Sequence, residues 1–108
     1  FESELTGIGV FSESFIKIVW VGLSNCEELQ RRIDISLEDL FKNEQRFMGH
    51  LTVARVKNVD DKKKFLDNLK KISVPKIKFI VSEFKLKESV LTKKGPVYSD
   101  IGIYPLEN

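Results

Sequence analysis

The residues with the clearest chemical potential lie together in segment 49–57. This segment holds the only histidine of the chain, His50, in an apolar, β-branched run that is typical of a strand. Because side chains alternate along a strand, His50 and Thr52 are expected on one face, about 6 to 7 Å apart. An imidazole that titrates near neutrality and a hydroxyl that donates a hydrogen bond can bind one phosphate group together and move a proton.

Arg55 could complete such a phosphate site. Its guanidinium group carries a permanent charge and offers two parallel N–H donors. Arg55 lies at an odd spacing from His50, so a regular strand would place the two on opposite faces. A shared site therefore requires a bulge, a strong twist or a strand end between them. The alternative is that His50 is a half-buried histidine whose ring is satisfied by a backbone carbonyl.

The spacing His-x-Thr-x-x-Arg in residues 50–55 resembles a signature of the 2H phosphoesterase superfamily. It is most similar to the second signature of the 2′-5′ RNA ligase (LigT-like) branch. Segments 7–11 and 16–22 resemble the paired strands that precede this signature in archaeal members, and segment 84–98 resembles their closing segment. The resemblance covers nearly the whole chain, and it implies a two-lobed fold in which antiparallel sheets with outer helices face each other.

The resemblance also implies an activity. Members open 2′,3′-cyclic phosphate ends of RNA, tRNA fragments among them, to 2′-phosphates, and can join ends through 2′-5′ linkages. Two histidines act as general acid and general base without a metal or cofactor, and each proton transfer typically contributes about 10²- to 10⁴-fold. By this resemblance His50 is one of the two proton-transfer groups, Thr52 donates to the phosphate, and Arg55 stabilises the phosphoryl charge.

The chain departs from the family pattern in one respect, because it carries a single His-x-Thr signature and members carry two. The first signature is expected upstream of Phe1, in an N-terminal half of the same protein or in a partner chain. Residues 1–108 are then a single domain that forms the C-terminal part of a LigT-like protein. Two alternatives stay open: an RNA-end-binding module without catalysis, and a structural half that needs an N-terminal partner.

Lys93 and Tyr98 flank the predicted turn at Gly95 and Pro96. A lysine and an aromatic ring are the usual means of holding single-stranded RNA, so both are candidate substrate-binding residues. The alternative is a solvated loop beside a core tyrosine. Phe11 and Trp20 are large apolar residues on predicted strands and are expected in the core.

Composition narrows the possible classes. With 108 residues and 42% hydrophobic content the chain can form one small domain, and a net charge of +2 favours local rather than extensive contact with RNA. A single cysteine, Cys26, cannot form an intrachain disulfide and fits a reducing compartment such as the cytoplasm. No apolar run approaches the length of a membrane span, and neither zinc-ligand spacing nor a phosphate-binding glycine loop is present, so no membrane, metal or nucleotide cofactor is expected.

The periodicity predicts an α+β domain with a mainly antiparallel sheet. Five strands and two helices are expected, in this order: strands 5–11 and 15–21, a helix from a capping box at residues 24–27 to Phe41, the strand of segment 49–57, a helix from residues 60–61 to before Pro75, a strand from residue 77 that bulges or breaks near residues 82–83, and a strand from Val97 to about Pro105.

Overall fold

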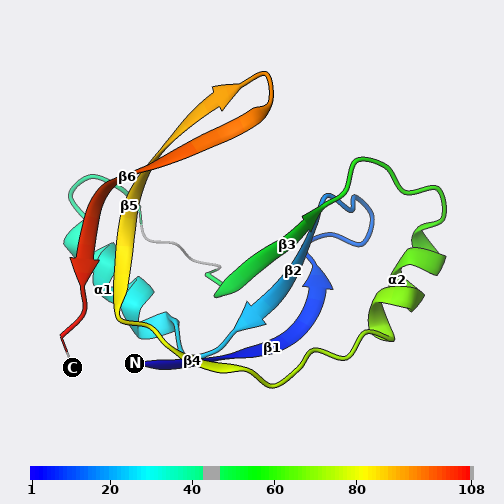
Figure 1. Cartoon of the computed structure of the whole chain (residues 1–108), viewed down its shortest axis with the longest axis horizontal. Coiled ribbons are helices and arrows are strands. Elements are labelled where there is room, and N and C mark those ends of the chain that lie inside the picture. Colours follow the sequence, from blue (N-terminus) through cyan, green and yellow to red (C-terminus); the bar gives the residue numbers. More distant parts are fainter. Residues whose placement is uncertain (43–46, 108) are drawn as a thin grey trace. The chain divides into compact units, whose positions relative to one another are not determined.

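The computed structural model describes residues 1–42 and 47–107. The chain divides into two compact units, of which the larger is Ser3–Phe79 and the smaller joins Phe1–Glu2 to the segment that begins at Ile80. The predicted α+β class with mainly antiparallel strands is confirmed (Figure 1). The elements in chain order are β1 (Glu2–Val10), β2 (Ile18–Leu23), α1 (Glu27–Ser36), β3 (His50–Arg55), α2 (Lys62–Lys70), β4 (Lys78–Ile80), β5 (Glu83–Thr92) and β6 (Gly95–Pro105).

The first four strands of the chain form one sheet in the order β3-β2-β1-β4. Strand β2 pairs antiparallel with β1 on one side and with β3 on the other. Val19 and Val21 lie on one face of β2 and are buried, at 5% and 8% exposure. Ile16, just before the strand, is buried as well. This apolar face of β2 is the core of the larger unit, so the opposite face of the sheet is free to carry functional side chains.

The predicted hairpin of the first two strands is confirmed. Trp20 on β2 lies opposite Gly9 on β1, and a Cβ atom at Gly9 would stand 2.7 Å from the indole ring. A glycine is therefore required there, since only a residue without a side chain lets the ring lie across the neighbouring strand. The connection between the strands is longer than the three polar residues predicted, and in it Ser12 Oγ accepts the N–H of Phe15 at 3.2 Å.

Helix α1 differs from its prediction at both ends. Ser24 does not cap it, because the Ser24 hydroxyl accepts the N–H of Glu4 at 3.0 Å and so ties the segment before the helix to β1. The helix also ends at Ser36 rather than Phe41. The apolar spacing beyond Ser36 failed as a guide because Phe41 is 66% exposed and so gains no buried contact that would extend the helix.

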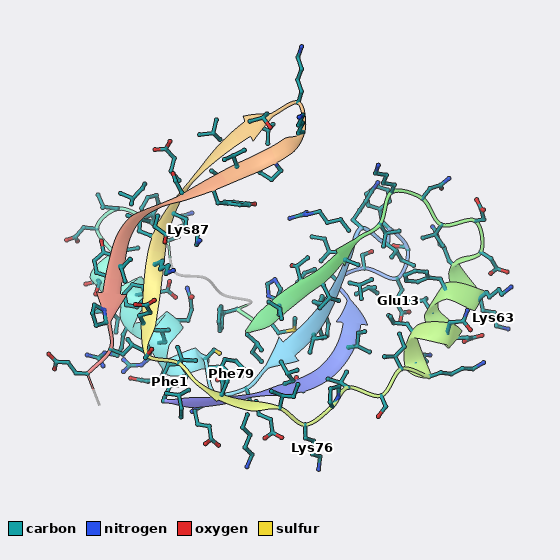
Figure 2. The ribbon with its side chains drawn as sticks, viewed as in Figure 1. Phe1, Glu13, Lys63, Lys76, Phe79 and Lys87 are labelled. Carbon is teal, nitrogen blue, oxygen red and sulfur yellow. The ribbon has the colours of Figure 1, made fainter. Side chains whose placement is uncertain are left out.

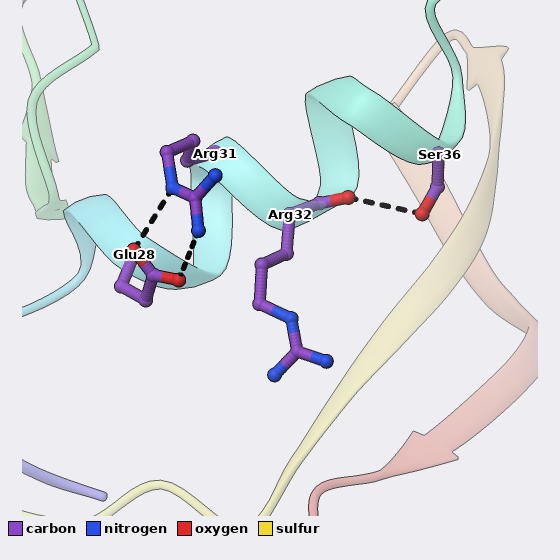
Figure 3. Close-up of polar contacts among 4 residues, drawn as sticks. All are labelled: Glu28, Arg31, Arg32 and Ser36. Atoms are coloured by element: carbon purple, nitrogen blue, oxygen red, sulfur yellow. Dashed lines mark hydrogen bonds and ion pairs between the residues drawn. The ribbon is translucent and has the colours of Figure 1, made fainter.

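Local polar contacts stabilise α1 itself (Figure 3). Arg31 donates to both carboxylate oxygens of Glu28 one turn earlier, at 2.9 and 2.5 Å. This pairing lowers the pKa of Glu28 through the hydrogen bond from Arg31 and raises the pKa of Arg31 in return. Near the other end, Ser36 Oγ donates to the carbonyl of Arg32 at 3.0 Å. Neither of the two helices in the described part of the chain has the length and apolarity that a membrane span requires.

The second helix follows its prediction more closely. Asp61 is the N-cap of α2, and its carboxylate accepts the N–H of Lys64 at 3.1 Å. The helix ends at Lys70, before Pro75. The predicted irregularity after it is a break at residues 81–82, which separates β4 from β5 and raises the number of strands in the described residues to six.

Strands β5 and β6 form a two-stranded antiparallel hairpin in the smaller unit. The predicted turn at Gly95 and Pro96 is misplaced by two residues, because Gly95 already pairs with Thr92 and the turn consists of Lys93 and Lys94. Gly95 has a φ of 105°, a left-handed value that glycine adopts without strain. Lys94 N–H donates to the hydroxyl of Thr92 at 3.2 Å and closes the turn.

Candidate active site

His50 and Thr52 lie on the same face of β3, as predicted. The register with β2 places His50 opposite Gly22 and Thr52 opposite Trp20. Directly opposed residues of an antiparallel pair project to the same side, and Gly22 and Trp20 share the face of β2 that is turned away from the core. Both side chains are exposed, so His50 is not sealed in an apolar core.

The irregularity predicted for this strand is confirmed. The register shifts by one residue after Thr52, so that Val53 is an extra residue, and the next pairs are Ala54 with Val19 and Arg55 with Ile18. Such a shift is a β-bulge, and it inverts the alternation of the residues that follow. Arg55 therefore lies on the face of Ile18, which is the face that carries His50 and Thr52. We call this face, defined by His50, Thr52 and Arg55, the site face.

The imidazole of His50 is held by a backbone carbonyl just before its strand. Nδ1 lies 2.8 Å from the carbonyl oxygen of Met48. A carbonyl can only accept a hydrogen bond, so Nδ1 carries a proton, and in the neutral ring Nε2 is the nitrogen that has the lone pair. The alternative is a half-buried histidine whose ring is bonded to a backbone carbonyl. Such a carbonyl is present, but the His50 ring is exposed, and Nε2 is available for chemistry.

The backbone just before His50 is fixed by close packing. Gly49 is buried, and its carbonyl accepts the N–H of Leu23 at 2.8 Å. A Cβ atom at Gly49 would stand 2.9 Å from the Leu23 carbonyl oxygen and 3.2 Å from Cys26 Sγ. The start of β3 thus packs against the end of β2 and against Cys26, the residue that precedes α1, whose part-buried thiol has a packing role there.

Phe11 and Trp20 extend the site face with aromatic surface. The Phe11 ring meets the His50 ring edge-on, at 5.1 Å and 87°, and lies 5.9 Å from the Trp20 ring. The prediction that Phe11 belongs to the core is wrong, because the residue follows the end of β1 and is 56% exposed. The register of the strands explains its position: Phe11 is two residues beyond Gly9, which lies opposite Trp20, so alternation assigns Phe11 to the same face.

Lys93 and Tyr98 belong to the hairpin of the smaller unit. Lys93 is exposed in the turn, and Tyr98 lies opposite Ser89 with 55% exposure, which excludes the alternative of a core tyrosine. On the same face of the hairpin, Asp100 pairs with Lys87 at 3.0 Å and with Lys85 at 3.3 Å. Hydrogen bonds from Lys87 and then Lys85 hold the pKa of Asp100 below its usual value. The role of Lys93 and Tyr98 in substrate binding stays a prediction.

Within residues 1–42 and 47–107, no three side chains of His, Cys, Asp or Glu are grouped so that they could hold a metal ion. The site face itself offers one imidazole, one hydroxyl and one guanidinium on a single strand, bordered by aromatic rings. An imidazole next to hydrogen-bond donors and a fixed positive charge can transfer a proton at a phosphate ester and stabilise negative charge on its oxygens.

Comparison with known proteins shows similarity to phosphoesterases. The sequence model of the family described as LigT like Phosphoesterase matches residues 22–98. An RNA 2′,3′-cyclic phosphodiesterase of Methanothermobacter thermautotrophicus is 37% identical along 98% of this chain and 61% of its own length. One of Methanocaldococcus jannaschii is 39% identical along 91% of this chain and 60% of its own length. One of Thermotoga maritima is 31% identical along 91% of this chain and 54% of its own length.

A solved structure, TT0787 of Thermus thermophilus, shares the fold with a TM-score of 0.68 at 23% identity, over 98% of this chain and 60% of that one. The chain thus spans about three fifths of the length of the first two relatives. Each relative carries the matched region and its remaining length in one polypeptide, which gives no support to a separate partner chain. The family match covers more than half of the residues, and the chain belongs to the LigT-like phosphoesterase family.

Proposed function

We propose that the protein containing this chain opens 2′,3′-cyclic phosphate ends of RNA to 2′-phosphates. The observation that carries the proposal is the β-bulge at Val53, which brings Arg55 to the exposed face of His50 and Thr52. The names of the relatives, RNA 2′,3′-cyclic phosphodiesterases, support the choice of substrate.

Each residue of the site face has a distinct role in this reaction. The His50 imidazole, oriented by Met48, transfers a proton at Nε2. The Thr52 hydroxyl donates a hydrogen bond to a non-bridging phosphoryl oxygen. Arg55 binds phosphoryl oxygens with a charge-assisted pair of hydrogen bonds and stabilises the negative charge that grows on them in the transition state.

The reaction needs two proton transfers. Attack of water on phosphorus requires a base, and cleavage of the bond between phosphorus and O3′ requires an acid that protonates the departing oxygen. His50 is the only histidine of these 108 residues, so the proposal assigns the second group to a residue outside them. Attack by a 5′-hydroxyl in place of water would form a 2′-5′ linkage on the same machinery, which extends the proposal to ligation.

The single histidine favours a second candidate function, an RNA-end-binding module without turnover. The site face could bind a cyclic phosphate through Thr52 and Arg55 while His50 donates one hydrogen bond. This candidate predicts binding of the cyclic end with no change in the bound RNA.

The test is an assay of the intact protein with an RNA oligonucleotide that ends in a 2′,3′-cyclic phosphate, in excess chelator. We expect hydrolysis to an end that carries only a 2′-phosphate, identified by its resistance to an enzyme specific for 3′-phosphates. Tight binding of the oligonucleotide without hydrolysis would establish the binding module instead. Formation of a 3′-phosphate would contradict the proposed direction of ring opening.

A further inference from the structure

The positive charge of the chain is concentrated in one segment of the larger unit. Residues 57–78 contain eight lysines, three aspartates and no other charged residue, which gives this segment a net charge of +5. The whole chain has a net charge of only +2, so the remaining residues are net acidic. We call residues 57–78 the lysine segment. A local basic patch on a nearly neutral protein is the electrostatic pattern of a nucleic-acid contact rather than of general solubility.

Helix α2 presents the centre of this charge on one surface. Its apolar residues are partly buried, whereas the lysines near its two ends are exposed: Lys63, Lys64, Lys70 and Lys71. Positions 63 and 70, like 64 and 71, are two helical turns apart and project to the same side, about 10 Å from each other. Figure 2 shows the side chain of Lys63 extending away from the helix.

These four lysines are available to a partner. None of them forms an ion pair with another residue that the structure describes. Two lysines of the hairpin strands differ in this respect, because Lys85 and Lys87 both pair with Asp100. An unpaired surface ammonium loses less when it exchanges water for a phosphate than one that must first leave a carboxylate.

The lysine segment is attached to the border of the site face. Immediately after β3, Val56 N–H donates to the carbonyl of Lys17 at 2.7 Å, and at the start of α2 the Lys62 ammonium group donates to the carbonyl of Ser14. Lys17 and Ser14 belong to the β1–β2 connection, which begins at Phe11, the residue whose ring contacts His50. The first residue of the helix is therefore hydrogen-bonded to the loop that borders the proposed phosphate site.

We propose that the exposed lysines of α2 bind the phosphodiester backbone of the RNA whose cyclic end lies at the site face. This inference rests on the proposed function and adds a requirement for substrate length. Contacts between ammonium groups and phosphates carry no sequence information, but they position the strand and contribute salt-dependent affinity. A cyclic mononucleotide, which has no neighbouring phosphates, gains nothing from the lysines, whereas an oligonucleotide does.

The experiment compares three double variants of the intact protein that each remove two positive charges. Two of them, Lys63→Gln/Lys64→Gln and Lys70→Gln/Lys71→Gln, alter α2. The third, Arg32→Gln/Lys42→Gln, is the control. Glutamine keeps a high helix propensity, and circular dichroism verifies that all three fold. The readouts are the affinity for a cyclic-ended RNA oligonucleotide as a function of salt, and the turnover of a 2′,3′-cyclic mononucleotide.

We expect each α2 variant to reduce the slope of log affinity against log salt by about 1.4, because about 0.7 is lost for each contact with single-stranded RNA. The ratio of the wild-type affinity for the oligonucleotide to that of the variant then falls about 7-fold between roughly 50 and 200 mM salt. The control should bind the oligonucleotide like the wild type, and the mononucleotide turnover should be unchanged in all three. Oligonucleotide binding by both α2 variants that matches the control would overturn the inference. Failure of the proposed function would appear separately, as absence of mononucleotide turnover in the wild type, and would leave the binding comparison readable.

Discussion

Arg55 shares an exposed face with His50 although it lies five positions further along the same strand. In a regular strand an odd separation places two side chains on opposite faces. The extra residue Val53 makes the difference, because the partner strand advances only four residues, from Gly22 to Ile18, over the same interval. The signature His-x-Thr-x-x-Arg is thus the sequence of a bulged strand, and its spacing is understandable only with the bulge.

Exchanging Ala54 and Arg55 tests the bulge directly. On a regular strand, position 54 would share the face of His50, so the variant Ala54→Arg/Arg55→Ala would keep the guanidinium in the site. With the bulge, position 54 lies opposite Val19 on the core face. We expect the exchange to lose turnover as Arg55→Ala does, by about 10- to 100-fold, the value of hydrogen bonds to a charged group. Turnover well above that of Arg55→Ala would show that the strand is regular in solution.

Phe11 should control the environment of His50. These 108 residues contain one histidine and one tryptophan. In the intact protein, the imidazole proton resonances of His50 are identified by their loss in His50→Ala, and the indole fluorescence of Trp20 by its loss in Trp20→Phe. Phe11→Ala should shift both signals and lower turnover about 2- to 10-fold, which corresponds to the energy of one aromatic pair. The matched control is Phe15→Ala, since Phe15 is 67% exposed and contacts Lys17 rather than His50. Equal spectral changes in the two variants would mean that Phe11 has no special relation to the histidine.

Gly49 should tolerate no side chain. An alanine there would force a shift at the start of β3, because its Cβ would stand 2.9 Å from the carbonyl oxygen of Leu23. We expect Gly49→Ala to lower the free energy of unfolding by about 1 to 3 kcal/mol, the usual cost of overpacking. Gly7→Ala is the control, since no atom lies within 4 Å of its added Cβ. Denaturant unfolding of both variants measures the difference, and equal stabilities would contradict the packing described at Gly49.

Asp100 should stabilise the β5–β6 hairpin in a pH-dependent way. Lys87 and Lys85 lower its pKa in the folded state, so the ionised carboxylate contributes stability above its usual pKa of about 3.8. That contribution is lost as the pH falls through the lower folded value, where the carboxylate takes up a proton. The unfolding free energies of the wild type and Asp100→Asn should therefore differ at neutral pH and converge once the pH lies below the lowered pKa of Asp100. Asp39→Asn is the control, because it removes a carboxylate that has no ion pair in the described residues. Its unfolding free energy should not show this pH-dependent difference from the wild type.

Alternation and periodicity predicted the parts of the fold that depend on local pattern. These include the β1–β2 hairpin, the strand of the signature, the Asp61 cap of α2 and the break after β4. The signature predicted His50 and Thr52 on one face, and the odd spacing of Arg55 predicted a bulge, a strong twist or a strand end, of which the structure has the bulge. In each case the residues themselves carry the information, because side-chain direction follows from position along the strand.

The predictions that failed depend on contacts between distant segments. Ser24 matched a capping box, but its hydroxyl binds the backbone of β1, a competition that no local window contains. The apolar periodicity continues to Phe41, but the helix ends at Ser36, because a helix extends only as far as its apolar face finds a partner. Phe11 is apolar and follows a strand, which suits the core, yet its position past the end of β1 leaves it on the site face beside His50.

The most direct test of the proposed site is the effect of His50→Ala on two quantities in the intact protein: turnover of a cyclic-ended RNA and equilibrium binding of the same RNA. Loss of a proton-transfer group should lower turnover by at least about 10²-fold, whereas binding should weaken much less, since a neutral imidazole contributes one hydrogen bond of about 1 kcal/mol. A large loss of turnover with nearly unchanged affinity is the predicted result. Equal losses of turnover and affinity, or no loss of either, would contradict a proton-transfer role for His50.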